Sequence, residues 1–451
     1  MKLGAKYLSF YLYIFLISTS YISCIIEIPL YPIEVKGIPK YKNISVSEQY
    51  DTYSENNFIS FAEEGNTFMN ANKLFIAKIK IGSREQIFNL LLDTGSSILW
   101  VARNDCEGDN SITNVFNPAT STTAKNTGQY FSMKYGSGAC NGYYYNDYME
   151  YIPKKKFNMY FGVASRADFN VHNCDGIIGL SKNYDDNRLS FIHMLKDYSN
   201  TDSLVFSIKF ENNEFIPNSE GKMYIGEHDD FSKKEAVSIS MEFYRNKIFW
   251  ALELSSFGLN NTRYYVQADY KINIIFDTGT NFIILPVNYL NGIKNRLKDF
   301  NCSLLQSGSS YQLILDPRDE IPDLVFKFGR HNFTMPGKYA FYLSISGLYV
   351  STITFDSTAS TFIIGSPFFF VFHTLFDSDS DELKFYPLKG GKIQSEKRLS
   401  TVAIIFIVIG SVVFVVGLIL IIYFSVKKCK EKKQKNIIPE NIGEDYYGLY
   451  K

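Results

Sequence analysis

LLLDTGSS, residues 90–97, and IIFDTGT, residues 274–280, are the two stretches that decide the fold of this chain. In each, a run of apolar residues typical of a buried strand ends in the tripeptide Asp-Thr-Gly, at Asp93 and at Asp277. One such tripeptide is a weak signal, because short motifs recur by chance. Two copies with matching flanks, one in each half of a 451-residue chain, predict an internal repeat that brings two carboxylates together.

Two aspartates that lie within hydrogen-bond reach cannot both ionise at low cost, so such a pair holds one proton between its members. The ionised carboxylate can take a proton from a bound water, while the protonated one donates to the oxygen of a carbonyl group. Gly95 and Gly279 lack a Cβ atom, which allows a tight turn and a close approach of backbone amides. The hydroxyl groups expected to fix the carboxylate planes belong to Thr94, Ser96, Thr278 and Thr280. The alternative is an ordinary strand and turn at each motif.

Six segments in the same order resemble the pepsin-like aspartic endopeptidases, over about residues 68–388. Beside the two motifs, they are the FSMKYGSGACNG, NCDGIIGL and FIIGSPFFFVFHTLFD stretches and the passage from MYIGEHD to FWALELSSFGLNN. The resemblance implies an all-β, bilobal fold with a pseudo-twofold repeat. It also implies the hydrolysis of peptide bonds by a water held between Asp93 and Asp277.

The stretch at residues 131–142 is similar to the flap of that family. Tyr135 is expected to close over a bound peptide, with its hydroxyl near the indole N–H of Trp100. The glycine-rich tip, Gly136-Ser137-Gly138, suits a hairpin that opens and closes. A surface hairpin with an incidental tyrosine is the alternative.

By position in the family, the pocket for the residue before the scissile bond should lie near Phe169, Cys174 and Ile177. An apolar pocket that prefers a bulky hydrophobic side chain is expected there.

Composition favours an all-β globular protein. Hydrophobic residues make up 46% of the chain and charged residues 20%, which suffices for a large core. Short Tyr-, Phe-, Ile- and Val-rich runs recur between Gly, Asn and Pro, as in proteins of many short strands. Basic and acidic residues are equal at 46 each, so the charge does not favour nucleic-acid binding. We expect a monomer that binds a polypeptide substrate. We expect no cofactor and no metal, because the five histidines are scattered and no metal-binding motif occurs.

Both ends of the chain carry targeting features. Residues 1–24 have the pattern of a secretory signal peptide, with an uncleaved anchor as the alternative. Residues 401–424 carry no charge and are long enough to cross a bilayer as a helix. Lysines follow at once, so the positive-inside rule predicts a single-pass type I protein of the secretory pathway with a lumenal or extracellular catalytic part. The tail, residues 425–451, is either read by a sorting adaptor or a solvated end. Sequons that fit lumenal loops occur at Asn43, Asn260, Asn301 and Asn332.

These features give the expected organisation of the chain. It consists of a signal peptide (1–24), a candidate prosegment (25–67), an N-terminal lobe (68–232), a C-terminal lobe (233–390), a linker (391–400), a transmembrane helix (401–424) and a cytosolic tail (425–451). The opening of 25–67 is similar to the prosegments of pepsin-like zymogens, in which a lysine pairs with the catalytic carboxylates. Lys36, Lys40 and Lys42 are the candidates. The segment is short for that family, so it could equally be an N-terminal strand that is never removed.

The cysteines depart from the family pattern. Once the signal region and the tail are set aside, four remain in an oxidising compartment, namely Cys106, Cys140, Cys174 and Cys302. The family usually closes a small loop after the first catalytic strand, and Cys106 lies where that loop begins. The next cysteine is Cys140 in the flap, so a Cys106–Cys140 disulfide is our hypothesis, although connectivity cannot be deduced from sequence.

Two functions compete on this scaffold. The first is an aspartic endopeptidase, within which composition and tail favour a membrane-anchored plasmepsin-type member from an apicomplexan. The second is a catalytically silent peptide-binding or adhesion protein. Silent relatives usually lose an aspartate, its glycine or the flap tyrosine, and all are intact here, which favours the enzyme.

Overall fold

The computed structural model describes most of the chain between residues 25 and 435. The described ranges are 25–34, 73–108, 112–135, 138–152, 155–168, 174–182, 191–199, 204–210, 221–241, 248–259, 266–294, 297–316, 318–344, 347–359, 362–388, 390–396 and 401–435. Several predicted features lie outside them: the signal peptide, the three prosegment lysines, Gly136, Ser137, Phe169 and the end of the tail. Residues 1–395 and 396–451 form two separate units.

The first lobe is built on one sheet, within which seven neighbouring strands carry the first Asp-Thr-Gly motif. In spatial order they are β2 (Lys73–Ile81), β3 (Gln86–Asp93), β8 (Gly176–Gly179), β4 (Trp100–Gly108), β7 (Lys155–Asp168), β6 (Ala139–Ile152) and β5 (Lys125–Lys134). The aliphatic run that precedes Asp93 is buried on both faces of this sheet, as expected for a central strand.

The second lobe repeats this order with other strands. They are β12 (Ala251–Leu259), β13 (Val266–Phe276), β21 (Phe362–Ile364), β14 (Ile283–Pro286), β20 (Tyr349–Asp356), β16 (Ser310–Leu315) and β15 (Ser303–Ser307). On the other side of β12 follow β17 (Leu324–Phe328), β18 (His331–Met335) and β24 (Lys392–Ser395), while β19 (Phe341–Leu343) pairs with β20.

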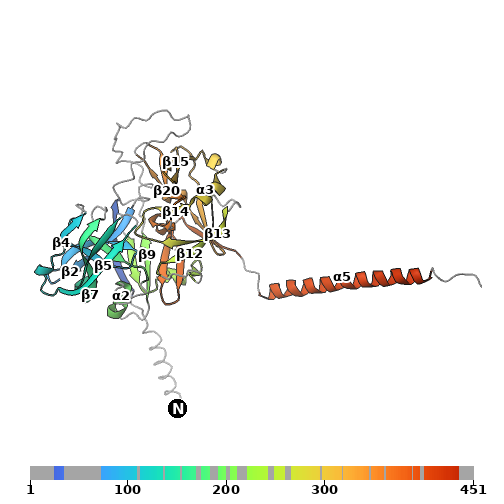
Figure 1. Ribbon diagram of the computed structural model, residues 1–451, viewed down its shortest axis with the longest axis horizontal. Helices are drawn as coiled ribbons and strands as arrows, with labels where there is room; N and C mark the ends of the chain where they lie inside the picture. The colour runs from blue at the N-terminus through green and yellow to red at the C-terminus, as the bar shows by residue number, and fades with distance from the viewer. Residues whose placement is uncertain are drawn as a thin grey trace, which may run out of the picture. The chain divides into compact units, whose positions relative to one another are not determined.

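Strand directions also match between the lobes. β3 runs parallel to β8, and β13 runs parallel to β21. β4 pairs with β8 antiparallel and with β7 parallel, and β14 does the same with β21 and β20. Figure 1 shows the two sets on opposite sides of this unit, with β2, β4, β5 and β7 on one side and β14, β15 and β20 on the other. The predicted bilobal all-β fold with an internal repeat is confirmed.

The two lobes share the strands that lie between them. The first sheet continues beyond β2 through β1 (Ile26–Glu34), β10 (Gly221–Ile225), β9 (Val205–Phe210), β22 (Phe372–Asp377), β23 (Glu382–Pro387) and β11 (Val237–Ser240). β9 comes from the first half of the chain and pairs antiparallel with β22, which comes from the second. The stacked rings of Phe206 and Phe376, 4.7 Å apart, join these strands in the core.

Strand β1 lies inside this sheet, although it opens the candidate prosegment. It pairs antiparallel with β10 on one side and with β2 on the other, and Ile28 and Leu30 are buried in the core. Residues 26–34 therefore form part of the sheet in the full-length chain, and their assignment to a prosegment or to a retained strand stays a prediction.

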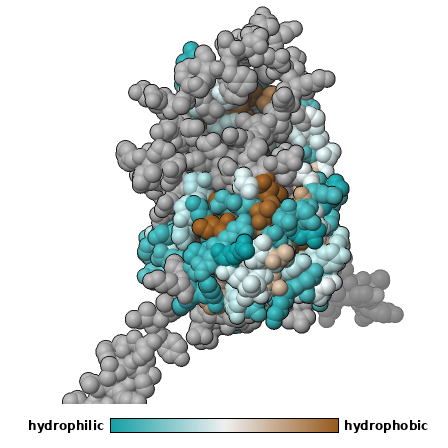
Figure 2. Space-filling model, turned by 90° about the vertical axis from the view of Figure 1, so that its left-hand side faces the viewer, coloured by the Kyte–Doolittle hydropathy of each residue, from teal (hydrophilic) through white to brown (hydrophobic). Residues whose placement is uncertain are grey.

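Short helices connect some of the strands. They are α2 (Phe191–Ser199), α3 (Val287–Ile293), α4 (Ser366–Phe369), and the 3₁₀ turns η2 (Pro118–Thr120), η4 (Asp229–Ser232), η5 (Leu297–Phe300) and η6 (Gly337–Tyr339). Aromatic rings supply much of the packing in the core. The ring of Phe368, for example, packs against those of Phe276 and Phe372, with centroids 5.5 and 4.5 Å apart. Figure 2 shows that the described surface on the first-lobe side is mainly hydrophilic, with small apolar areas between polar ones.

The second unit contains one long helix, α5 (Thr401–Lys435), labelled in Figure 1. Within Val408–Lys430, the most apolar window of 18 residues has a mean hydropathy of 2.7, so this helix is long and apolar enough to cross a membrane. It begins where the predicted transmembrane segment begins and continues into the lysine-rich stretch.

Candidate active site

Asp93 and Asp277 occupy corresponding places in the two lobes. Asp93 is the last residue of β3, and Asp277 directly follows β13. The short parallel strands β8 and β21 anchor both loops: the Leu180 amide donates to the Asp93 carbonyl at 2.8 Å, and the Asp277 amide donates to the Ile364 carbonyl at 3.0 Å. Both aspartates therefore project from rigid sheet.

Thr94 and Thr278 join the two lobes by reciprocal hydrogen bonds. The Thr278 amide donates to Thr94 Oγ1 at 3.0 Å, and the Thr94 amide donates to Thr278 Oγ1 at 3.2 Å. Each hydroxyl then donates across to a strand of the other lobe: Thr94 to the Phe276 carbonyl at 2.7 Å, and Thr278 to the Leu92 carbonyl at 2.9 Å. These hydroxyls thus tie the loops to each other, whereas we had expected them to bond the carboxylates.

The glycine of each loop lies against the carboxylate of the other lobe. A Cβ atom on Gly95 would stand 2.8 Å from Asp277 Cγ, and one on Gly279 would stand 2.6 Å from Asp93 Oδ1. In proteins, a Cβ atom essentially never comes within 3.0 Å of a heavy atom outside its own and its neighbouring residues. Glycine is therefore required at both positions for the two carboxylates to meet.

Each carboxylate also accepts hydrogen bonds from its own loop. The Gly95 amide donates to Asp93 Oδ1 at 2.9 Å, and the Gly279 amide donates to Asp277 Oδ1 at 2.8 Å. The Ser96 hydroxyl donates to Asp93 Oδ2, as predicted. The described contact of Thr280 is different, since its backbone carbonyl accepts from the Ser366 amide at 2.7 Å.

The two aspartates form one buried, coupled pair. Asp93 is 6% exposed and Asp277 is 8% exposed, and a side-chain hydrogen bond links them. Burial raises the pKa of Asp93 well above its ordinary value, and the negative charge of Asp277 raises it further. The Ser96 hydroxyl and the Gly95 amide act in the opposite direction. A proton is therefore retained by the pair well above the pH at which a free aspartate ionises.

The flap hairpin is formed by β5 and β6, and the Tyr135 amide donates to the Gly138 carbonyl at 2.8 Å across its turn. Trp100 Nε1 donates to the Tyr135 hydroxyl at 2.8 Å, so the predicted contact between these residues is confirmed. Burial raises the pKa of Tyr135 well above its usual value, and Cys140 and Asp93 contribute to the shift. The tyrosine hydroxyl thus remains protonated close to the aspartate pair.

The predicted pocket residues are described in part. Ile177 and Cys174 are buried in the same apolar cluster as Trp100, against which the ring of Tyr135 packs. Cys174 Sγ donates to the Gly176 carbonyl at 2.9 Å. The assignment of these residues to a substrate pocket stays a prediction.

The Cys106–Cys140 disulfide that we expected is absent, because both cysteines are free thiols in the structure. Cys106 lies on β4 and Cys140 on β6, and β7 runs between these strands. Cys140 instead shares a side-chain hydrogen bond with Tyr135, a contact that no sequence motif predicted.

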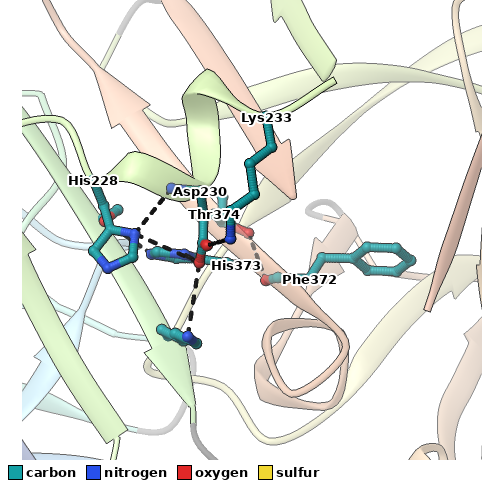
Figure 3. Close-up of polar contacts among 8 residues, drawn as sticks. His228, Asp230, Lys233, Phe372, His373 and Thr374 are labelled. Carbon is teal, nitrogen blue, oxygen red and sulfur yellow. Dashed lines mark hydrogen bonds and ion pairs between the residues drawn. The ribbon is translucent and has the colours of Figure 1, made fainter. Parts of the chain in front are cut away.

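A second polar cluster lies apart from the aspartates. Figure 3 shows His228 and Asp230 at the short helix η4 and His373 on strand β22, with contacts that converge on the Asp230 carboxylate. One ligand atom from each of the three residues lies within 4.8 Å of the others, a spacing that suits a metal ion. Lys233 and Lys209 already reach the same carboxylate, at 2.5 and 3.7 Å, and their charges oppose a cation there. In the sequence, all five histidines are scattered. This cluster is not visible there, because His373 lies 143 residues from Asp230 along the chain.

Comparison with known proteins places the fold and the loops in context. The family model described as "Eukaryotic aspartyl protease" matches residues 74–388, a range that includes both Asp-Thr-Gly loops. "Vacuolar protease A" of Aspergillus fumigatus is 29% identical over 329 residues, which cover 69% of this chain and 78% of that protein. "Vacuolar aspartic protease" of Candida albicans is 28% identical over 333 residues, covering 70% and 76%. "Plasmepsin IV" of Plasmodium falciparum is 26% identical over 339 residues, covering 70% and 69%.

Proposed function

Because the chain belongs to the eukaryotic aspartyl protease family and is an aspartic endopeptidase, we propose that Asp93 and Asp277 carry out its reaction on one shared water. The observation that carries this proposal is the crossed packing of Gly95 and Gly279, which sets each glycine against the opposite carboxylate. The same packing gives no reason to favour a silent binding protein, which needs no such approach.

The proposed reaction begins with one proton on the aspartate pair. The ionised carboxylate takes a proton from the water, whose oxygen attacks the scissile carbonyl carbon, while the protonated carboxyl gives its proton to the carbonyl oxygen. The resulting gem-diol then collapses: the protonated carboxyl gives its proton to the amide nitrogen as the C–N bond breaks, and one gem-diol hydroxyl passes its proton to the ionised carboxylate as the carbonyl re-forms. A carboxylic acid and an amine leave, and the pair again holds one proton. The amides of Gly95 and Gly279 and the Ser96 hydroxyl hold the carboxylates in place throughout.

Peptide turnover tests this proposal directly. The full chain, in detergent, should cleave a quenched peptide of mixed hydrophobic sequence, and pepstatin should block the cleavage. Measurement at acidic and neutral pH locates the loss of this proton, because burial and the charge of Asp277 raise the pKa of Asp93. If a folded sample neither cuts peptides nor binds pepstatin, the silent scaffold is the better account.

The flap is proposed to close over the bound peptide with Tyr135 as its inner face. The bond from Trp100 Nε1 to the Tyr135 hydroxyl supports this role, because it holds the end of β5 against strand β4. A closed flap excludes water and strengthens the electrostatic interactions of the pair.

Tyr135→Phe should therefore lower kcat/KM by about three- to tenfold, since one buried hydrogen bond contributes about 1 kcal/mol. The loss should appear mainly in KM, because the carboxylates are untouched. Tyr143→Phe is the matched control, since that tyrosine is exposed on β6. Equal kinetics of the two variants would contradict the proposed closure.

The chain is proposed to be a type I membrane protein that faces the lumen or the exterior with both lobes. The apolar helix α5 and the lysines that end it support this orientation. A tag at the C-terminus should be digested by protease added outside intact vesicles, while the lobes stay protected. Protection of the tag, with digestion of the lobes, would indicate the opposite orientation.

The segment 25–67 is proposed to keep its first strand after any processing. β1 hydrogen-bonds to two neighbours, and its removal would leave both β10 and β2 with an open edge. N-terminal sequencing of the mature protein checks this. A mature chain that begins after residue 34 and carries no bound 26–34 peptide would restore the prosegment hypothesis.

A further inference from the structure

The connection between the lobes is held in place by a buried ionic cluster. After β10, the chain passes through His228 and the turn η4 to β11, which lies at the edge of the shared sheet. Asp230 in this turn is 4% exposed, and His373 of β22, which it contacts, is fully buried. The phenyl ring of Phe231 packs on the His373 ring with centroids 4.6 Å apart. The turn therefore rests on the imidazole of His373.

Both nitrogens of the His373 ring have partners. Nδ1 lies 3.0 Å from Asp230 Oδ2, and Nε2 lies 2.9 Å from Ser207 Oγ on β9. A neutral imidazole satisfies both contacts, because Nδ1–H donates to the carboxylate and Nε2 accepts from the serine hydroxyl. One uncharged histidine thus joins η4, β9 and β22.

The charges that face His373 come from each element packed against it. Asp230 supplies one negative charge, while Lys233 at the end of η4 and Lys209 of β9 supply two positive ones, at 2.5 and 3.7 Å from the carboxylate. His228 lies 3.5 Å from the carboxylate, and its ring centroid is 5.1 Å from that of His373. Two tyrosines complete the surroundings: Tyr224 of β10 against both histidine rings, and Tyr386 of β23 beneath Lys233. Among the described groups, positive charge already exceeds negative charge there.

We propose that this cluster is an acid-sensitive lock, which holds the inter-lobe connection against the shared sheet while His373 is neutral and releases it when His373 takes up a proton. A proton on His373 adds a further positive charge to a fully buried ring that already faces more positive than negative groups. Protonation also turns His373 Nε2 into a hydrogen-bond donor, so the Ser207 hydroxyl can no longer donate to it. The lock does not depend on the proposed roles of Asp93 and Asp277.

The direction of the pH dependence follows from the same contacts. Burial lowers the pKa of His373 to about 4 from its ordinary 6.5, although the bond to Asp230 raises it. The unfolded chain therefore binds this proton at a higher pH than the folded chain does. The contribution of neutral His373 to the free energy of unfolding is complete above pH 6.5 and is lost as the pH falls towards 4. The hydrogen bond from His373, followed by that from Lys233, holds the pKa of Asp230 well below its usual range. The contribution of the ionised Asp230 carboxylate to stability is therefore lost at a still lower pH.

Thermal melting of the full chain in detergent tests the lock. The Asp277→Asn background prevents self-cleavage and removes one member of the aspartate pair from the titration. The melting temperature of this parent should fall by at least about 5 °C between pH 7 and 4.5. His373→Asn, which keeps an N–H donor for Asp230 and cannot take up a proton, should lose most of that fall. His331→Asn, a buried histidine on β18 in the other sheet, is the matched control and should keep it.

Further arms keep the proposal testable if His373→Asn does not fold. Lys209→Gln removes one facing positive charge, so its acid transition should shift to lower pH. An unchanged pH profile in both His373→Asn and Lys209→Gln, or an equal flattening in His331→Asn, overturns the lock. Zinc and EDTA are added in parallel to the parent. A melting temperature that EDTA lowers and Zn²⁺ restores, in the parent but not in His373→Asn, would instead identify a bound cation.

Discussion

Asp277→Asn should abolish peptide hydrolysis and leave the fold intact. Asparagine cannot ionise or pass on a proton, so the pair loses its exchange of one proton with water. General acid–base catalysis contributes about 10²- to 10⁴-fold, and here both halves of it depend on the pair, so we expect kcat/KM to fall by about 10⁴-fold. The melting temperature should stay the same or rise, because the charge of Asp277 is one cause of the raised pKa of Asp93.

A matched buried aspartate gives the opposite result. Asp147 is fully buried in the first lobe and accepts hydrogen bonds from the hydroxyls of Ser121 and Thr123. Asp147→Asn should lower the melting temperature, since a charged acceptor of two hydroxyls is lost, and keep the activity per folded molecule. Measurement of kcat/KM and melting temperature on both variants separates the roles. Residual turnover above a few percent in Asp277→Asn would contradict the proposed chemistry.

Gly279→Ala should inactivate the enzyme by displacing the opposite aspartate. The new methyl group would stand 2.6 Å from Asp93 Oδ1 and 3.2 Å from Asp277 Oδ1, so both carboxylates must move. A displacement of about 1 Å at a catalytic group lowers activity by about 100-fold. The strain should also reduce the free energy of unfolding by about 1–3 kcal/mol.

Gly128→Ala is a control glycine substitution that strains the backbone without a steric clash. Gly128 has a φ of +74° and open space around it, so alanine there meets conformational strain but no neighbour. It should lower stability by about 1–2 kcal/mol and leave kcat/KM unchanged. If Gly279→Ala retains kcat/KM and pepstatin affinity, the carboxylates do not meet as closely as the glycine packing indicates.

The sequence predicted the parts of the site that depend on local motifs. The two Asp-Thr-Gly loops, the repeat and the bond between Trp100 and Tyr135 all follow from short segments whose chemistry is specific. The bilobal fold and the family were predicted for the same reason, while the finer assignment to a plasmepsin-type enzyme stays a prediction.

Contacts between distant segments were beyond the reach of the motifs. His373 and Asp230 are 143 residues apart, and no local pattern relates strand β22 to the turn η4. The disulfide hypothesis paired Cys106 with the next cysteine along the chain, whereas sheet order placed a third strand between the two. Likewise, the apolar alternation of β1 gives no sign of its two partners, which lie far along the chain.

The pairing of β9 with β22 also bears on how the protein is made. A ribosome delivers residues 205–210 long before residues 372–377, so the nascent chain has an unfinished edge at β9 during most of its synthesis. That edge closes only when the last strands before α5 have emerged. A stalled or truncated product that ends before residue 372 should therefore be retained by chaperones or aggregate, rather than accumulate as a half-sized soluble domain.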